Sequence, residues 1–563
     1  MTTPKMLAGM TPNSHAVATF AFSPALLGQS PAAFLKNHRS PMPSGNFNSP
    51  GMFAALGVTG TPSMQQLPPD ENKKRELAEI LRVLGTRPGR ISVAAVERLA
   101  KGMGLECYKD TDPATGGTTL SLAAKIFLLD IEFTGDKVER VQISFENTPG
   151  PSSDLAAQAA AIFQKNLTPS SLSPGRPPLL VPSLSDFAEN LTRFYRTDKL
   201  SGSINCFAAI TGIYQSLRKI YEYERDSMDS EMAVMCVGNG RPAMHVRGKV
   251  GLSIDYWKER RTSAEQEEGE DGEEKLWRIM IEVEETPPDF ENNLNMGNMT
   301  ITPVRASDQW VSDEVKKSNN LFDEELTTDW LEPPLEELLD VTGDSSASRP
   351  SSARFLARLD PPVVVPLQDQ MELYTGMQMT GLGTLETLLF PGLPPSNDTY
   401  RHIHVPDSTA PLHHYHLHPY LKPVYVRYVS EIPFSHPRDI LPILRTLRQY
   451  VLVKTLLESC FSPLHPSPPP PSPPHSSIDD LNFFLDSTSP STGEVPVDIT
   501  LEPGQQFGIR VVFPERANTG VVNMQVQVGR NAEVSVKQNE RAEKAIKACE
   551  DLGLVVEWIR RQS

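Results

Sequence analysis

The chain has 563 residues and a formal net charge of −17. Sequence-independent binding to nucleic acid needs clustered lysine and arginine, so this acidic balance argues against that function. No run of about 18 apolar residues is present, which argues against a membrane-spanning helix. The 51 prolines are close to twice the usual share of ~5 %, so we expect folded modules separated by segments that join no core.

The cysteines and the N-terminal stretch point to a reducing compartment. The five cysteines are odd in number and show no short spacing, which argues against a disulfide framework or a zinc knuckle. Residues 1–69 are rich in Pro, Ser, Ala, Met and Gly and show no sustained period, so we predict a disordered tail. This tail lacks the compact apolar stretch of a signal peptide.

A first module is predicted over residues 70–167. Apolar residues follow helical spacing at both ends of this range, but between them the period changes from 3.6 to 2. The alternating stretches flank a Gly-Asp pair, which is typical of a β-hairpin with one buried face. The predicted elements are a helix beginning near Glu71, a helix beginning at Ser92, strands over 127–133 and 141–145, and a helix over 154–167.

A second module, residues 168–345, is centred on a predicted helix within 200–226. Its apolar arc is wider than the roughly 100° stripe of a surface helix, so we expect more than one layer to cover it. An acidic run over 263–274 is interpreted as a solvated hairpin insertion, because so many charges cannot be buried. The other predicted elements are a helix starting near Leu184 and strands over 232–237, 244–250, 252–257 and 277–283.

The strand over 277–283 follows the acidic insertion directly. A strand beside such an insertion is easily left at the edge of a sheet, where its backbone groups can pair with another chain. We therefore predict that this strand, or another exposed edge, pairs with a neighbouring protein.

Two further modules, 346–461 and 494–563, are joined by a Pro/Ser-rich linker over 462–493. The first combines an extended buried edge over 360–367 with a helix over 438–458. The second has strands over 495–501, 507–513, 521–528 and 532–536, a helix over 539–551, and a closing strand with Leu554, Val556 and Trp558. Helices and strands alternate without a regular βαβ rhythm, which favours an α+β fold over a doubly wound sheet.

Catalytic motifs are missing from the sequence. It contains no phosphate-binding or dinucleotide-binding glycine loop, no HExxH, no GxSxG and no CxxC, which lowers the expectation of an enzyme. We therefore assign no catalytic, cofactor-binding or metal-binding residues.

A histidine-rich stretch offers the alternative of a metal-dependent enzyme. His402 and His404 would share one strand face, as would His414, His416 and His418. Neutral imidazoles two residues apart can meet one transition-metal ion. We favour the simpler interpretation of a polar strand face or an exposed loop.

Two LxxLL sequences and one acidic-aromatic segment are candidate partner contacts. On a helix, the leucines of LxxLL share one side and can enter an apolar groove, although internal packing is the favoured interpretation of so common a pattern. Of the two, Leu335, Leu338 and Leu339 are a better docking candidate than the leucines of 385–389, because prolines and a Ser-rich run isolate them.

The acidic-aromatic segment covers residues 476–486. Its acidic residues keep the chain soluble while Phe483, Phe484 and Leu485 can serve as apolar anchors, as in disordered activation segments. A short element that docks on the protein itself is an equally good interpretation.

Several separate segments together resemble the fungal form of the Mediator complex subunit 1 family. In order they are LSGSINCFAAITGIYQSLRKIYEYE, GRPAMHVRGKVGLSIDYWKERR, KLWRIMIEVE, ITPVRASDQWVS, DWLEPP, RFLARLDPPVVVPL, LRQYVLVKTLLE and NAEVSVKQNERAEKAIKACEDLGLVVEWIRR. No single segment is a biochemical motif, and their ordered sum makes the resemblance specific. It covers most of the chain from about residue 71 to residue 561.

This resemblance implies a nuclear, non-catalytic scaffold or docking subunit without a cofactor. It implies assembly with other Mediator subunits in the middle module, contact with transcription factors, and an indirect link to RNA polymerase II, without direct sequence-specific contact with nucleic acid or contact with a membrane. Animal relatives contact nuclear receptors through LxxLL segments outside this fungal-like core, so that role is not carried over to Leu335 or Leu385. An unrelated cytoplasmic scaffold is the other alternative.

Overall fold

The computed structural model describes most of the chain beyond residue 88. It covers residues 89–113, 116–145, 153–168, 184–201, 205–260, 275–285, 309–318, 326–332, 353–367, 382–390, 398–403, 411–418, 424–461, 494–516 and 520–562, and single residues at 77, 307 and 369. The chain divides into the units Met1–Leu77 and Ala78–Ser563, and every element described below belongs to the second unit. The predicted tail, the helix near Glu71 (apart from Leu77), the acidic insertion 263–274 and the linker 462–493 lie outside the described residues.

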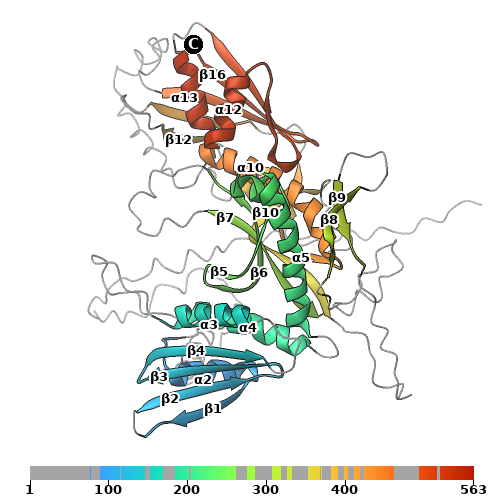
Figure 1. Cartoon of the computed structure of the whole chain (residues 1–563). Coiled ribbons are helices and arrows are strands. Elements are labelled where there is room, and N and C mark those ends of the chain that lie inside the picture. The colour runs from blue at the N-terminus through green and yellow to red at the C-terminus, as the bar shows by residue number, and fades with distance from the viewer. Residues whose placement is uncertain are drawn as a thin grey trace, which may run out of the picture. The chain divides into compact units, whose positions relative to one another are not determined.

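The first sheet is antiparallel, with its strands side by side in chain order (Figure 1). They are β1 (Glu106–Thr111), β2 (Gly117–Ala123), β3 (Phe127–Thr134) and β4 (Lys137–Phe145). The predicted hairpin is confirmed as β3 and β4, with the alternating residues of β3 buried on one face. Strands β1 and β2 were not predicted, because their polar and threonine-rich sequences lack the apolar alternation.

Three helices cover the inner face of this sheet: α2 (Val93–Met103), α3 (Ser153–Leu167) and α4 (Ser185–Leu200). The hydroxyl of Ser92 accepts a hydrogen bond from the backbone N–H of Ala95 and caps α2, which confirms the helix predicted to begin here. Helices α3 and α4 also contact the next sheet, so they form a layer between the two (Figure 1). The ring centroid of Phe194 on α4 lies 5.5 Å from that of Phe127 and 5.4 Å from that of Phe163, and both contacts are edge-to-face.

The central sheet has six antiparallel strands in the order β11-β14-β10-β7-β6-β5. Their bounds are β5 (Arg241–Val246), β6 (Lys249–Lys258), β7 (Leu276–Glu285), β10 (Ala353–Pro366), β11 (Leu382–Thr384) and β14 (Tyr425–Phe434). The prediction of an edge strand at 277–283 is wrong, because β7 pairs with β6 on one side and with β10 on the other. The insertion before β7 lengthens the β6–β7 connection and leaves the strand in the sheet interior.

The prolines of the 360–367 stretch also lie within the sheet and not at an edge. Strand β10 pairs with β7 and β14, and the pairing with β14 is interrupted between Arg358 and Val363. Pro361 and Pro362 fall in this irregularity, where their missing N–H groups interrupt no regular ladder. Burial of Val363, Val364 and Val365 is confirmed.

The predicted central helix is α5 (Cys206–Ser227), which packs on β5, β6 and β7. Asn205 caps it by accepting hydrogen bonds from the backbone N–H groups of Phe207 and Ala208. The two-stranded ribbon β8 (Val311–Ser318) and β9 (Leu326–Trp330) supplies a further layer, and the backbone N–H of Trp310 donates to Ser216 of α5 over 3.0 Å. This additional layer over α5 agrees with the wide apolar arc in the sequence of the helix.

The 232–237 stretch is a helix, α6 (Glu231–Cys236), where the sequence predicts a strand. The hydroxyl of Ser230 accepts a hydrogen bond from the backbone N–H of Ala233, which favours helix initiation. A six-residue apolar run carries no period that distinguishes a buried helix from a buried strand.

The last sheet combines strands from both sides of the Pro/Ser-rich stretch, in the order β12-β13-β15-β16-β17-β18. Their bounds are β12 (Asp398–His402), β13 (Leu412–Leu417), β15 (Glu494–Glu502), β16 (Phe507–Pro514), β17 (Val521–Val528) and β18 (Val534–Val536). Strands β13 and β15 pair in parallel, and the other neighbours pair antiparallel. The central sheet likewise combines strands from both sides of residue 345, so two of the expected module boundaries are crossed by sheets.

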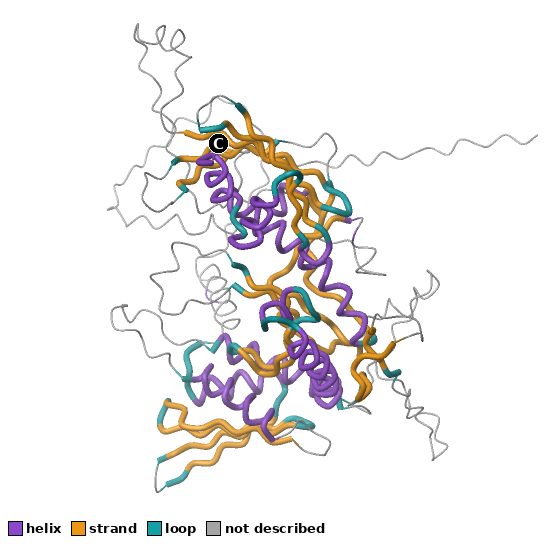
Figure 2. The backbone as a smooth tube through the Cα atoms, turned by 45° about the horizontal axis from the view of Figure 1, so that its top comes forward, coloured by secondary structure: helices purple, strands orange, loops and turns teal. Residues whose placement is uncertain are grey.

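Helix α10 (Ile440–Phe461) begins after a 3-10 turn, η3 (Pro437–Asp439), and 18 of its 22 residues are buried. It contacts β6 and β10 of the central sheet and β12 and β17 of the last sheet. Figure 2 shows helices and strands in alternating layers. A helix apolar on all sides belongs in the interior of a protein, so α10 is the core element that joins these two sheets.

The chain closes with a 3-10 turn and two helices: η4 (Arg530–Ala532), α12 (Glu540–Cys549) and α13 (Leu552–Gln562). The prediction of a final strand with Leu554, Val556 and Trp558 is wrong. Its residues alternate over a short range but form α13, in which Val555 and Val556 are buried against the core. The α+β fold is confirmed, and no helix in the described ranges is long and apolar enough to cross a bilayer.

Candidate partner-binding pocket

Of the two LxxLL sequences and the acidic-aromatic segment, the structure describes only the LxxLL sequence at 385–389. Leu335, Leu338 and Leu339, as well as Phe483, Phe484 and Leu485, lie outside the described residues. The second LxxLL sequence forms α9 (Leu385–Leu389), in which Leu385 and Leu389 are buried and Leu388 packs against the core. The predicted internal packing of this motif is therefore confirmed.

The described parts of the histidine-rich stretch belong to the neighbouring strands β12 and β13, whereas His404 lies outside the described residues. The ring of His414 stacks on Tyr400 with centroids 4.4 Å apart, Nδ1 of His416 lies 2.7 Å from a carboxylate oxygen of Asp398, and Nε2 of His418 lies 3.2 Å from Asp498. In the described part of the chain, no group of three or more His, Cys, Asp or Glu side chains is arranged to hold a metal ion. The polar strand face is the arrangement that the structure shows here.

His413 lies on the opposite face of β13 and is fully buried. Its Nδ1 lies 3.1 Å from the hydroxyl of Tyr415, and its Nε2 lies 3.3 Å from a carboxylate oxygen of Glu557 on α13. Burial lowers the pKa of His413, so the neutral ring accepts from Tyr415 and donates to Glu557. Burial alone would raise the pKa of Glu557, but hydrogen bonds from His413 and Arg561 and the charge of Arg560 lower it to about 2. The contact fixes α13 on the sheet.

A largely apolar pocket lies where the first two layers meet the central sheet. Its walls come from β4, α4, α5, β5, β6 and β7, and its cavity measures about 40 Å³. It lies along the seam between two hydrophobic clusters, one containing Phe194 and Phe207 and the other containing Ile210 and Met244. The apolar lining residues are Phe145, Phe194, Phe207, Ile210, Met244, Val250, Met280, Ile281 and Val283.

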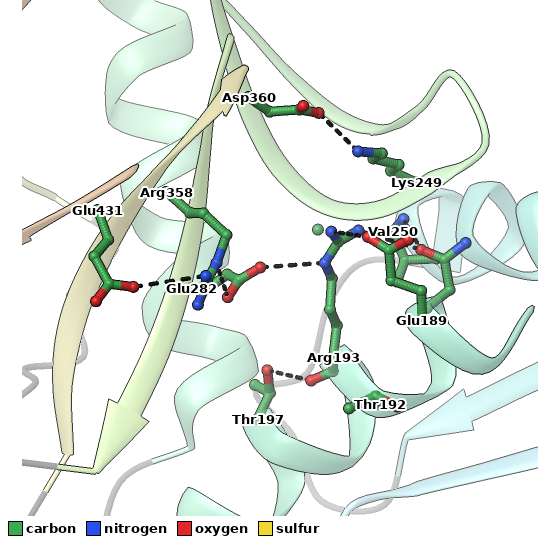
Figure 3. Close-up of polar contacts among 12 residues, drawn as sticks. Glu189, Thr192, Arg193, Thr197, Lys249, Val250, Glu282, Arg358, Asp360 and Glu431 are labelled. Atoms are coloured by element: carbon green, nitrogen blue, oxygen red, sulfur yellow. Dashed lines mark hydrogen bonds and ion pairs between the residues drawn. The ribbon is translucent and has the colours of Figure 1, made fainter. Parts of the chain in front are cut away.

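A chain of ion pairs runs along one border of this pocket, from α4 across the central sheet (Figure 3). Arg193 contacts Glu189 at 2.5 Å and Glu282 of β7 at 3.1 Å. Arg358 of β10 contacts the other oxygen of Glu282 at 3.1 Å and Glu431 of β14 at 3.6 Å. Because both Arg193 and Glu282 have only 15 % of their side chains exposed, solvent screens their contact less than it would a surface pair.

Asn190 holds α4 on the turn between β5 and β6 below the pocket. Its Nδ2 donates to the carbonyl of Gly248 over 2.7 Å, and its Oδ1 accepts from the backbone N–H of Val250 over 3.0 Å. The Asn190 side chain is buried, so these bonds satisfy backbone groups that water does not reach. Together with the ion pairs, they fix the pocket walls before any partner arrives.

His245 closes one side of the pocket in an unusual backbone conformation, with φ +50°. Its Nδ1 accepts a hydrogen bond from the backbone N–H of Gly251 over 3.1 Å, and its ring lies 6.2 Å from the ring of Phe194. Burial lowers the pKa of His245 to about 4. The imidazole is therefore neutral at pH 7, and protonation of Nδ1 would break the bond to Gly251.

This lowered pKa predicts a loss of stability in mild acid. The unfolded chain binds a proton near pH 6.5, whereas folded His245 binds one only near pH 4. The free energy of unfolding should be unaffected by this group above pH 6.5 and should fall as the pH drops through 6.5 toward 4, by about 2 kcal/mol at pH 5. Between pH 7.5 and pH 5, the free energy of unfolding of His245→Asn should fall by about 2 kcal/mol less than that of the wild type. Urea denaturation at the two pH values would measure this difference.

His402→Asn is the control for this experiment, because His402 is exposed. Asparagine at 245 tolerates positive φ and keeps an oxygen that can accept from Gly251. The other buried histidines, His413 and His436, also have lowered pKa values. They should contribute equally to the acid destabilisation of the wild type, His245→Asn and His402→Asn. Equal acid destabilisation of the wild type and His245→Asn would contradict the assignment.

The described lining of the pocket is largely apolar. Its described lining has no cysteine or serine nucleophile beside a base, and its one histidine is neutral and held by a backbone amide. Sequence reasoning missed this pocket, since its walls come from segments between residues 145 and 283 that only folding brings together. No local motif marks it.

Comparison with known proteins identifies the family of this chain. The family model described as Mediator of RNA polymerase II transcription subunit 1 matches residues 78–462, more than half of the chain. The protein of that name from Schizosaccharomyces pombe is 26 % identical over 388 residues, which cover 66 % of this chain and 70 % of the relative. The matched range contains the first sheet, the central sheet, the pocket and α10. The chain therefore belongs to the Mediator of RNA polymerase II transcription subunit 1 family.

Proposed function

We propose that this chain is a nuclear, non-catalytic subunit of the Mediator complex that helps relay signals from gene-specific transcription factors to RNA polymerase II. The observation that carries the proposal is the family match over residues 78–462. The proposed place of the subunit is the middle module, beside other Mediator subunits.

The proposed mechanism is binding alone. The layers from the first sheet to the last offer surfaces to neighbouring subunits, and exposed apolar side chains such as Tyr108, Tyr428 and Trp558 are candidate contacts. Leu335, Leu338 and Leu339 and the set Phe483, Phe484 and Leu485 stay predicted partner contacts. Several weak contacts on one chain would add up to a stable assembly, because each contact raises the effective concentration of the next.

Purification of the tagged full chain from nuclear extract tests this proposal. At moderate salt we expect a set of Mediator subunits to co-elute in stoichiometric amounts, as measured by quantitative mass spectrometry. Chemical cross-linking of the eluate would then show whether the nearest neighbours belong to the middle module. Elution of the chain alone, or with cytoplasmic proteins only, would reject the proposal.

A further inference from the structure

Helix α13 carries an exposed apolar side. Leu554 and Trp558 are 36 % and 37 % exposed, and residues four apart share one side of a helix. Arg561 follows three residues after Trp558 on the same side. Val555 and Val556 are buried in the core and hold the helix in place. We call Leu554, Trp558 and Arg561 the outer side of α13, and such a surface suits an apolar segment that ends in a carboxylate.

The stretch 462–493 starts beside the first turn of α13. The described residue that precedes it is Phe461, the end of α10. Two residues earlier, the hydroxyl of Ser459 accepts a hydrogen bond from the backbone N–H of Leu552 over 3.0 Å. Leu552 is the first residue of α13, so the chain enters the stretch at the N-terminal end of this helix.

The same stretch ends beside the last turn of α13. It leads into β15, whose Asp498 pairs with Val512 of β16 in antiparallel register, so Pro496 lies level with Pro514. The carbonyl of Pro514 accepts a hydrogen bond from Nε of Arg560 over 3.2 Å. The two ends of the stretch therefore lie at the two ends of α13.

The acidic-aromatic segment lies within this stretch. Its apolar residues are Phe483, Phe484 and Leu485, and Asp486 follows them. Residues 462–482 precede this set and residues 487–493 follow it, so the two tethers can span up to ~69 Å and ~23 Å. Helix α13 has 11 residues and is only ~16 Å long. Both tethers are therefore long enough to lay the segment along α13.

The direction of the chain matches the order of the groups on the outer side. A segment that runs from the first turn of α13 to the last would meet Leu554 and Trp558 before Arg561. Its own apolar residues likewise come before Asp486. A flexible tether of this kind gives an effective concentration in the millimolar range, so a contact with a Kd of about 1 mM would already be formed half of the time.

We propose that the segment 483–486 docks in cis on the outer side of α13, with its apolar residues against Leu554 and Trp558 and with Asp486 beside Arg561. The inference goes beyond the proposed function, because the contact lies within one chain and needs no other subunit. Both surfaces are candidate partner contacts, so in the isolated chain each would cover the other. A partner that takes either one would release the second for a further contact.

Photo-crosslinking of the purified full chain tests the proposal. With benzoylphenylalanine in place of Phe484, we expect crosslinks within one chain to residues 552–562, mapped by mass spectrometry of the monomer band. Benzoylphenylalanine in place of Ser472 is the control and should crosslink to α13 about tenfold less, because a tether alone brings it only into the same volume. Crosslinks from position 484 only to other regions, or only between two copies, would overturn the proposal, as would equal yields at the two positions.

A charge placed on the outer side locates the contact. Leu554→Glu should reduce the crosslink from position 484 about tenfold without changing the melting temperature, because Leu554 is exposed and a buried carboxylate opposes docking. Leu382→Glu is the matched control, since Leu382 is 48 % exposed on β11 of the central sheet. Equal loss in both variants would indicate non-specific apolar contact and would reject the site.

Acrylamide quenching of Trp558 gives a readout without a crosslinker. The difference between the chain and its Trp558→Phe variant isolates Trp558 from the other four tryptophans. Alanine at all three positions of 483–485 should raise the quenching constant of Trp558 about twofold, since a contact formed half of the time shields the ring for that time. Alanine at positions 469–471 is the control, and equal constants for the two triple variants would contradict docking.

Discussion

Replacement of Arg448 by methionine is expected to lower the free energy of unfolding by about 4 kcal/mol or more, because it leaves several buried acceptors without donors. Arg448 lies in the middle of α10 and has 1 % of its surface exposed. Its guanidinium donates to the carbonyls of Tyr256, Met235, Val237 and Gly238 and to Oδ1 of Asn531, over distances of 2.6 to 3.2 Å. These acceptors belong to α6, to the turn after it, to β6 and to η4.

The planar guanidinium is needed at this place because its donors spread in a fixed fork. Burial lowers the pKa of Arg448 to about 10, so the group remains charged at neutral pH. The dipoles of the carbonyls that it contacts stabilise this charge. The ammonium of lysine has three donors on a single nitrogen and cannot reach all five acceptors. Arg448→Lys should therefore recover little of the free energy of unfolding that Arg448→Met loses.

Arg445→Met is the matched control for Arg448→Met, since Arg445 lies one helical turn away on α10 and is exposed. Urea denaturation followed by circular dichroism would measure all three variants. We expect a change within about 0.5 kcal/mol for Arg445→Met. A loss for Arg448→Met as small as that of the control would show that the carbonyls find other donors and that Arg448 does not join these elements.

Deletion of residues 494–563 is expected to abolish cooperative unfolding of the remaining chain, although the family match ends at residue 462. Strand β13 would lose its parallel partner β15, and the buried residues of α10 would lose the cover of β17, η4 and α13. Gln449 of α10 would also lose its partners, because its Nε2 donates to the carbonyls of Gln505 and Val528. The exposed apolar surface should cause aggregation.

Deletion of residues 1–77 is the control, since these residues form the other unit of the chain. We expect this variant to melt in one transition close to that of the full chain by differential scanning calorimetry. A truncation at 493 that stays monomeric and melts with an unchanged, sharp transition would show that the last sheet is dispensable for the rest. That result would also separate the fold of the family-matched range from the fold of residues 494–562.

These two predictions concern the same feature, namely the dependence of α10 on both of its neighbouring sheets. Arg401 of β12 adds a further connection, because it pairs with both carboxylate oxygens of Asp551 at 2.9 and 2.8 Å and donates to the carbonyl of Ser459 at the end of α10. Asp551 is almost fully buried, so this bidentate contact compensates its charge. These contacts connect the end of α10 to both β12 and the start of α13.

Local periodicity identified the elements whose sequence carries a long, unambiguous repeat. The hairpin β3–β4, α5 and α10 were all predicted, because burial on one face or on all sides leaves a pattern over many residues. Predictions from short apolar runs were wrong: α6 and α13 were predicted as strands, since five or six residues do not separate a period of 2 from one of 3.6. The family was recognised because many segments that resemble it occur in the same order along the sequence.

The sequence by itself determined the α+β class, the main amphipathic elements and the family of this protein. Only the tertiary structure decided the order of the strands, the interior position of β7 and the existence of the pocket. The physical reason is that each of these depends on partners far away in the chain. Leu356, for example, lies opposite Glu282 on one side and Pro433 on the other, and no local pattern around residue 356 specifies either neighbour.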